Sequence, residues 1–469
     1  YELAENLKII RKRLTNMEIG FDFETEILIV GGGPAGVSTA FTLGKDGKKT
    51  ILIDKKPYDR IGDKVCGDAL SPFYTELAND QIGLPLPNDS NGELSELCDS
   101  AVLVGKSKDS ILNLGSRSAT VDRHLYGQAL IKSLSQFDSV QVMSETRVKE
   151  AIVSNNRLIG LVCISAEKGE IRIQANCVVD ASGSSGIVRK RLPAQMCAKF
   201  PRKIPKHQML VAYREIIKTS KPHNYRNKLY LTYEPEIEDI MPGYYWYFSK
   251  GEKLLNIGLG YLLEDHNIGK NIKEINEKVR KRVFPDAEVI ASQGDQIPSR
   301  LPLPSCVHNG FLAVGDAAAM ANPLNGEGHG IALLAGIQAG KNLIQSNNYT
   351  EEELWDYNKW VWNQFGVEFS WGIAIVKFVR KFGIDTFDWL MRKNILQEDD
   401  ILTMINNPEE NINIVERAMR GWYKPKVLLG LRKTMNLAKQ IQEHSKNYPS
   451  IDNFDKWYDK LSYLENYKI

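Results

Sequence analysis

The stretch from residue 26 to residue 54 constrains the fold of this chain more than any other part of it. It begins with the apolar run Glu26–Val30, which is typical of a buried parallel strand. Gly31, Gly33 and Gly36 follow with GxGxxG spacing, and then come a helical pattern and a second strand. In this setting the first glycine makes a tight turn, the second lets a diphosphate approach the backbone, and the third lets helix and strand pack closely. The pattern therefore predicts a Rossmann-like unit that binds a dinucleotide.

Neighbouring residues complete the predicted dinucleotide site. The helix that begins at Pro34 and Ala35 directs unpaired N–H groups and the positive end of its dipole toward a diphosphate. Asp54 ends the second strand 18 residues after Gly36, close to the spacing of a carboxylate that binds ribose hydroxyls. Lys55 follows it and is included in the site. A glycine-rich structural turn is the alternative, but strand, glycines, helix and carboxylate all agree with the binding interpretation.

A second strand that ends in a carboxylate favours FAD over a nicotinamide cofactor. Asp316 ends an apolar run that begins at Gly310, and a glycine-rich loop at 322–330 then opens a helix. A carboxylate at a strand end can bind the ribityl chain, although it can also cap a helix. The positive end of the helix favours the negative charge of a reduced flavin. The loop residues whose N–H groups can approach a flavin ring are Gly326, Gly328 and Gly330.

Composition excludes several classes of protein. The 60 basic and 58 acidic residues give no overall attraction to nucleic acid. The six cysteines include no CxxC pair, so neither a disulfide framework nor a metal site is predicted. No apolar run approaches the roughly 20 residues that cross a bilayer, and the charged, helix-patterned segment Tyr1–Met17 lacks the apolar core of a signal peptide. We expect a cytoplasmic protein.

The order of predicted elements indicates an α/β fold in several pieces. A discontinuous Rossmann-like FAD-binding domain is expected, with an inserted antiparallel β-rich substrate domain and a helical C-terminal region. Residues 76–100 are predicted to be an irregular insertion, because Pro, Asn, Gly and Ser are frequent there. The predicted boundaries are 24–75, 115–190 and 296–347 for the FAD-binding domain, 76–114 and 191–295 for the substrate domain, 348–469 for the helical region, and 1–23 for an N-terminal extension.

Together these motifs resemble the flavoproteins that include aromatic hydroxylases, flavin halogenases and geranylgeranyl reductases. The shared features are Gly31–Gly36, Asp54, Arg123, the turn from Asp180 to Gly183, and Gly315-Asp316. The resemblance implies that Arg123 lies near the FAD and that Asp316 binds its ribityl chain. It also adds Asp180 and Gly183 to the expected cofactor site.

Two further motifs are similar to those of the geranylgeranyl reductase family. Residues 60–71, with Cys66 and Gly67, look like the family's cysteine-glycine loop beside the flavin. Tyr244-x-Trp246-x-Phe248 looks like its aromatic substrate motif. Val65 and Ser249 stand where the family usually has proline, but neither departure removes a chemical group.

The resemblance, closest to the archaeal lipid enzymes of the family, implies a function. Reduced FAD would deliver hydride to C=C bonds of geranylgeranyl chains, most closely those of archaeal-type glycerophospholipids. An external donor is implied, either ferredoxin, a reduced deazaflavin or NAD(P)H, with peripheral contact at the inner face of the membrane and no nucleic-acid partner. A flavin monooxygenase or halogenase on the same scaffold is the alternative enzyme, and a flavin-binding carrier without turnover is the alternative from another class.

The aromatic motif predicts a slot for a hydrocarbon chain. Tyr244, Trp246 and Phe248 alternate along a strand and therefore share one face. The next strand places Gly258 and Gly260 on one face, and aromatic walls beside missing side chains suit a ligand that offers no hydrogen bonds. The alternative is that the aromatic stripe belongs to the core.

The C-terminal region contains five tryptophans, at 355, 360, 362, 371 and 389. They could pack between helices or contact a membrane surface, and packing is favoured.

Saturation of an isolated alkene requires a proton source and the exclusion of water. Cys66, Tyr244 and a bound water are the candidate donors, with His329 a weaker one that could equally face solvent. Cys66 could instead be a small buried hydrophobe. Arg60 and Lys64 could neutralise a headgroup phosphate or simply be solvated.

Overall fold

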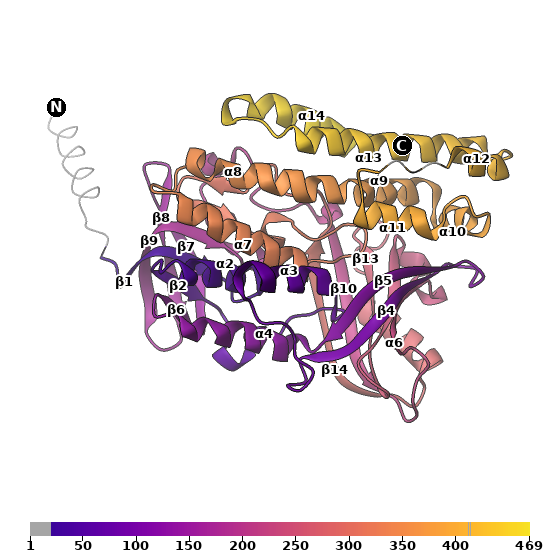
Figure 1. Cartoon of the computed structure of the whole chain (residues 1–469), viewed down its shortest axis with the longest axis horizontal. Coiled ribbons are helices and arrows are strands. Elements are labelled where there is room, and N and C mark those ends of the chain that lie inside the picture. The colour runs from indigo at the N-terminus through magenta and orange to yellow at the C-terminus, as the bar shows by residue number, and fades with distance from the viewer. Residues whose placement is uncertain (1–19, 411, 413) are drawn as a thin grey trace.

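The computed structural model describes residues 20–469 apart from 411 and 413. The helix pattern predicted for Tyr1–Met17 lies outside the described residues. Figure 1 shows two sheets toward opposite ends of the molecule, with the C-terminal helices layered above them. The α/β class, the β-rich insertion and the helical C-terminal region predicted from the sequence are confirmed.

The first sheet supplies the Rossmann-like core. Its strand order is β15-β16-β9-β1-β2-β6, parallel from β16 to β6, and β7 and β8 extend it as an antiparallel meander from β9. Val30 pairs with both Ile53 and Asp180, and Asp180 pairs with Ala313, so these strands end at one edge. In open α/β sheets that edge is where ligands bind. The strands are β1 (Phe23–Val30), β2 (Thr50–Ile53), β6 (Val140–Met143), β7 (Thr146–Ser154), β8 (Arg157–Ser165), β9 (Gly169–Asp180), β15 (Val307–His308) and β16 (Phe311–Ala313).

The second sheet carries the aromatic motif. Its order is β14-β10-β13-β12-β11-β4-β5-β3, and it is antiparallel except where β11 runs alongside β4. The strands are β3 (Ala69–Leu70), β4 (Leu94–Val104), β5 (Ile111–Val121), β10 (Met209–Lys218), β11 (Lys228–Thr232), β12 (Gly243–Ser249), β13 (Leu254–Leu262) and β14 (Glu288–Pro298). Strands β3 and β5 lie in this sheet although the predicted boundaries put most of their residues in the FAD-binding domain, and the domain division itself stays a prediction.

Helices cover the first sheet and connect it to the second. Thr39 of α2 donates its hydroxyl hydrogen to the carbonyl oxygen of Gly336 in α7 at 3.1 Å, so these two helices lie in direct contact. Asp122 caps α4 by accepting from the N–H groups of His124 and Leu125. The helices of this part are α2 (Pro34–Lys45), α3 (Pro72–Ile82), α4 (Arg123–Lys132), α5 (Ile187–Arg191), α6 (Ile272–Val283) and α7 (His329–Gln345).

The prediction of an irregular insertion at 76–100 was wrong for much of its length. Helix α3 runs from Pro72 to Ile82, and β4 begins at Leu94. Proline at the first helical turn and Gly83 in a left-handed conformation at φ +78° after the last turn mark its ends. These signals were present in the sequence, but the polar residues between them obscured the helical period.

The C-terminal helices form a layer of their own. Figure 1 shows α13 and α14 outermost, above α8 and α9. Trp355, Trp362, Trp371 and Trp389 are buried, as the packing interpretation predicted. Within residues 20–410, 412 and 414–469, no helix has both the length and the apolarity to cross a bilayer. The helices are α8 (Glu351–Val361), α9 (Val367–Phe382), α10 (Ile384–Arg392), α11 (Glu398–Asn406), α12 (Val415–Ala418), α13 (Pro425–Lys446) and α14 (Phe454–Asn466).

Candidate functional site

One cavity of about 2760 Å³ joins the predicted cofactor residues to the aromatic strand. Its walls come from the carboxyl edge of the first sheet, one face of the second sheet, the Cys66 loop and the glycine-rich loop before α7. This volume exceeds the several hundred Å³ of an ordinary ligand pocket. It therefore has room for a dinucleotide and for a long chain beside it.

The GxGxxG turn has the geometry that a dinucleotide requires. Gly31 has φ +111°, a conformation that side chains disfavour, and a Cβ on Gly36 would overlap the carbonyl oxygen of Gly31. Gly33 begins α2 without any side-chain cap, and Pro34 occupies its first turn. Gly31, Gly33, Pro34 and Ala35 line the cavity. The first turn of α2 is therefore open to an anion, as the sequence predicted.

Asp54 is held rigidly at the end of β2. One of its oxygens accepts from the N–H of Gly32 at 2.8 Å, and the other accepts from the N–H of Lys56 at 2.9 Å. Both Asp54 and Lys55 line the cavity. A carboxylate oriented by two backbone donors, with lone pairs remaining, fits the predicted contact with ribose hydroxyls.

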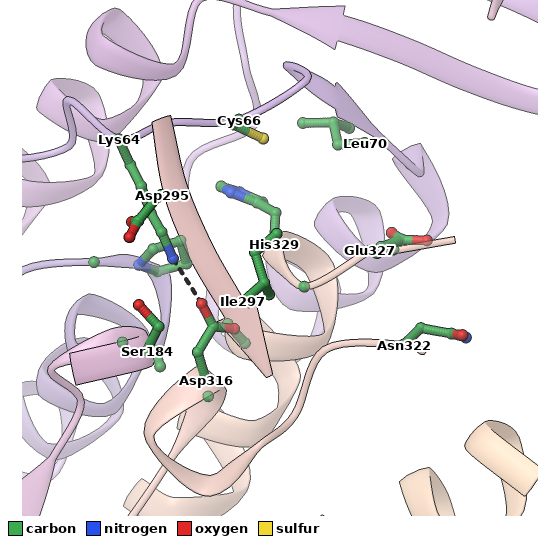
Figure 2. Close-up of a pocket in the computed structure, with 18 of the residues that line it drawn as sticks. Lys64, Cys66, Leu70, Ser184, Asp295, Ile297, Asp316, Asn322, Glu327 and His329 are labelled. Carbon is green, nitrogen blue, oxygen red and sulfur yellow. Dashed lines mark hydrogen bonds and ion pairs between the residues drawn. The ribbon is translucent and has the colours of Figure 1, made fainter. Parts of the chain in front are cut away.

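Asp316 forms an ion pair across the cavity. Its carboxylate lies 2.7 Å from the ammonium of Lys64, and Figure 2 shows Lys64 pointing to it from the loop that carries Cys66. The charge of Asp316 raises the pKa of Lys64 above its ordinary value. Lys64, which the sequence left open as a phosphate ligand or a solvated side chain, instead has this carboxylate as its partner. Arg60 is exposed and pairs with Asp63.

Arg123 and His329 are buried together beside the glycine-rich loop. The Arg123 guanidinium contacts the His329 ring, and both residues line the cavity. Burial, with added repulsion from Arg123 and Lys64, holds the pKa of His329 well below its usual value, so the ring is neutral. His329 is 8% exposed, so the interpretation that it faces solvent is wrong. A neutral ring cannot serve as a cationic acid near pH 7.

Two other predicted cofactor positions are related to the cavity in different ways. Gly183 lines it, but Asp180 is fully buried and does not. Asp180 accepts from the hydroxyl of Ser182 at 2.5 Å and from the N–H of Arg189 at 3.0 Å. It therefore orients the turn that contains Gly183 rather than facing a ligand.

The glycine-rich loop presents the start of α7 to the cavity. Gly326 and Gly328 line it, and Gly328 precedes the first turn of α7 without a side-chain cap. Gly330 is the second residue of α7 and packs against the side chain of Tyr74. The loop can thus offer N–H groups and a helix dipole to a flavin, as predicted, through Gly326 and Gly328.

The aromatic motif and the two glycines lie on adjacent strands, β12 and β13. Tyr244 pairs with Gly260, and Trp246 pairs with Gly258, so both sets share one face of the sheet. A Cβ on Gly258 would overlap the Trp246 ring, and Gly260 lines the cavity beside Tyr244. The aromatic side chains that line it are Tyr244, Trp246 and Phe248. Glycine at 258 therefore leaves room for the indole. Trp246 and Phe248 pack in a small buried cluster and also form part of the cavity wall.

The Tyr244 hydroxyl points toward the flavin loop. It donates to the carbonyl oxygen of Asn325 at 2.9 Å. Burial raises the pKa of Tyr244 to about 12. The phenol therefore keeps its proton across the physiological range and remains a possible donor.

The Cys66 loop is tied to the aromatic strand by a buried network that the sequence analysis missed. The Asn256 amide donates to the carbonyl oxygen of Cys66 and to Asp68, both at 2.9 Å, and accepts from the Trp246 indole at 2.9 Å. Lys250 pairs with Asp68 at 3.1 Å, with both side chains less than 10% exposed. Cys66 itself lines the cavity as a free thiol. The network fixes the loop against the slot and places the thiol on its wall.

A pair of half-buried carboxyl groups was also missed. Glu327 of the flavin loop and Glu368 of α9 line the cavity, and burial raises the pKa of each to about 7. Asn322 donates to Glu368 at 3.1 Å, and the Tyr74 hydroxyl lies 3.4 Å away. No lysine or arginine forms an ion pair with either carboxyl within the described part of the chain. Glu327 stood in the glycine-rich motif, whereas nothing in the sequence marked Glu368.

Comparisons with known proteins agree with this site. Residues 26–191 match the model of a family described as FAD dependent oxidoreductase. The digeranylgeranylglycerophospholipid reductase of Sulfolobus acidocaldarius is 28% identical over 91% of this chain and 94% of its own length. A geranylgeranyl bacteriochlorophyll reductase-like protein from Thermoplasma acidophilum shares the fold, with a TM-score of 0.71 and 19% identity over 88% of this chain and 99% of its own.

A flavin-dependent brominase also shares the fold, at a TM-score of 0.65 and 16% identity over 86% of this chain and 99% of its own. The predicted resemblance to geranylgeranyl reductases is confirmed, and so is FAD as the cofactor. Several features of the cavity fit FAD. They are the glycine turn, Asp54 and the first turns of α2 and α7, which have no side-chain cap.

Proposed function

We propose that this FAD-dependent oxidoreductase saturates the C=C bonds of geranylgeranyl chains, most closely those of archaeal-type glycerophospholipids. The observation that supports this most directly is the aromatic slot, which opens into the same cavity as the cofactor residues. Its walls offer contact area and almost no hydrogen-bonding groups, which suits a hydrocarbon chain. The name of the Sulfolobus acidocaldarius relative supports the same class of substrate.

FAD, when bound and reduced, supplies the hydride for such a reaction. The residues of this chain have other tasks. Trp246 and Phe248 hold the chain and exclude water, and Asn256 keeps the Cys66 loop against them. A proton must reach the second carbon of the bond, and we assign that proton to the Tyr244 hydroxyl or the Cys66 thiol, which both line the slot.

We further propose that the enzyme meets its substrate at a membrane surface. The exposed apolar side chains of residues 419–429, which join α12 to α13 and begin α13, are Met419, Trp422, Tyr423 and Leu429. The basic residues among them are Arg420, Lys424 and Lys426. Aromatic rings that accompany lysine and arginine suit the boundary between headgroups and acyl chains. The reducing equivalents would come from an external donor, either ferredoxin, a reduced deazaflavin or NAD(P)H.

An anaerobic reoxidation assay tests the proposal. The bound flavin is reduced chemically, a geranylgeranylated glycerolipid is added, and flavin absorbance and lipid mass are followed together. We expect reoxidation with mass gains in steps of two hydrogens. Trp246→Ala should slow it, whereas Tyr247→Phe, on the opposite face of β12, should not. Reoxidation by oxygen alone, stimulated by an aromatic substrate, would instead assign the enzyme to the monooxygenase or halogenase side.

A further inference from the structure

A segment of unusual charge borders the cavity. Residues 181–214 contain eight lysines and arginines and no acidic residue, although the whole chain has a net charge of only +2. Some of these cations have clear structural partners, since Lys199 pairs with Glu351 and Arg214 bonds to Gln293. Lys190, Lys203 and Lys206 do not, because no carboxylate in the described ranges forms an ion pair with them.

These three lysines line the same cavity as the cofactor motifs and the aromatic slot. The segment that carries them is fixed in place, because Arg202 donates to the carbonyl oxygen of Lys190 at 2.8 Å and Arg189 donates to that of Pro201. Arg189 is 1% exposed, lines the cavity, and has an Nε without a hydrogen-bond partner. Burial and the charges of Arg189 and Lys203 lower the pKa of Lys190. A bound anion would relieve this repulsion.

The lysines are connected to the slot by a continuous wall. Lys206 is followed by Met209 and Leu210 at the start of β10, and both line the cavity. Leu210 packs against Gly260, which pairs with Tyr244. At about 3.3 Å per residue, Lys206 lies at most about 13 Å along the chain from Leu210. A hydrocarbon chain in the slot can therefore follow β10 and end at the lysines.

We infer that Lys190, Lys203 and Lys206 form a subsite for the phosphate of a polyprenyl phosphate ester, which fixes the polar end of the substrate while its chain occupies the aromatic slot. This inference rests on the proposed function for the identity of the chain. The diphosphate of FAD has its own place at the uncapped start of α2, so it does not require these lysines. Ammonium groups on flexible stems suit a phosphate that must enter and leave.

The test compares two ligands that differ only in phosphate. Geranylgeranyl phosphate and geranylgeraniol are titrated calorimetrically into the FAD-loaded, oxidised protein. We expect the wild type to bind the phosphate ester at least about tenfold more tightly, and the variant Lys190→Gln/Lys203→Gln/Lys206→Gln to reduce that ratio to about threefold or less. Affinity for geranylgeraniol should not change.

A matched variant removes the same charge elsewhere. Arg191, Lys218 and Lys253 are exposed and lie outside the cavity lining, so Arg191→Gln/Lys218→Gln/Lys253→Gln should keep the preference. Equal binding of the two ligands by wild type, or loss of both in the cavity variant, would overturn the inference. So would inorganic phosphate that binds as tightly as the ester, which indicates a site for free phosphate. Loss of flavin from the cavity variant would reassign the lysines to the cofactor. Turnover is not measured, so failure of the reoxidation assay would be a separate result.

Discussion

The half-buried carboxyl of Glu368 makes the stability of the protein depend on pH, and Glu368→Gln should remove part of that dependence. Burial raises its pKa from 4.5 to about 7. The contribution of Glu368 to the free energy of unfolding is therefore fully present below about pH 4.5, the pKa of this carboxyl in the unfolded state. It is lost as the pH rises through about 7. A difference of roughly 2.5 pKa units corresponds to about 3 kcal/mol above pH 7. Glutamine keeps an acceptor for the Asn322 amide and carries no charge.

This free energy can be expressed as a melting temperature. An entropy of unfolding near 2.1 cal/mol/K per residue gives about 1 kcal/mol/K for 469 residues, so about 3 kcal/mol shifts Tm by about 3 °C. We expect Glu368→Gln to raise Tm by about 3 °C at pH 8.5 and by less than about 1 °C at pH 5. At pH 5 the wild-type carboxyl is protonated in the folded state and mostly ionised in the unfolded state, but the pH is only about half a unit above the unfolded-state pKa, so the two states differ by less than about 1 kcal/mol.

The assay is thermal unfolding of the FAD-loaded protein at one scan rate and both pH values. Glu443→Gln serves as the control, because Glu443 is exposed on α13 and should give no shift at either pH. An equal shift at the two pH values would refute the reasoning, since packing rather than ionisation would then explain it. A lower Tm for Glu368→Gln at pH 8.5 would refute it as well, because it would show that the charged form is stabilised.

Three further outcomes are expected. Tyr244→Phe keeps the ring of the slot and removes the hydroxyl. If the phenol is the proton donor, kcat for alkene reduction should fall about 100-fold with KM unchanged. An unchanged kcat would assign the proton to Cys66. Gly36→Ala should abolish flavin retention on gel filtration, because its Cβ would overlap the carbonyl oxygen of Gly31; a variant that keeps its yellow colour would contradict this. Trp422→Ser should lower co-sedimentation with anionic vesicles several-fold, while Tyr463→Ser, which removes another exposed ring on α14, should not. Equal losses would contradict a specific surface.

The features predicted well from the sequence are those set by local patterns. The GxGxxG turn, Asp54 and the alternation of Tyr244 with Trp246 depend on periods of a few residues, and the cross-strand pairing with Gly258 follows from the same alternation. The structure shows the aromatic and glycine positions on one face of the second sheet, whereas their use as a substrate slot stays a prediction.

The features missed depend on contacts between distant segments. Asn256 touches the Cys66 loop across 190 residues of sequence, and Glu368 lies near the flavin loop only because α9 folds back over it. The burial of His329 required the same kind of information, since Arg123 is 206 residues away in the chain. Burial of a polar group is a property of the assembled fold, and a single sequence carries little signal for it.

The strand order of the first sheet also means that the two parts of the cofactor site are synthesised at different times. Strand β1 is among the first described segments made, yet its partner β9 ends at Asp180 and the neighbouring β16 ends at Ala313. At about 5 to 20 residues per second, roughly 15 to 60 s separate the emergence of the glycine turn from that of the loop at Gly326. The ribosome therefore releases one half of the flavin pocket long before the other. Strand β1 finds both of its partners, β2 and β9, by residue 180, but the end of β9 at Val178–Asp180 lacks its partner until β16 emerges. The cofactor site is incomplete until the start of α7 follows, so we expect added flavin to stabilise only chains that have passed this point.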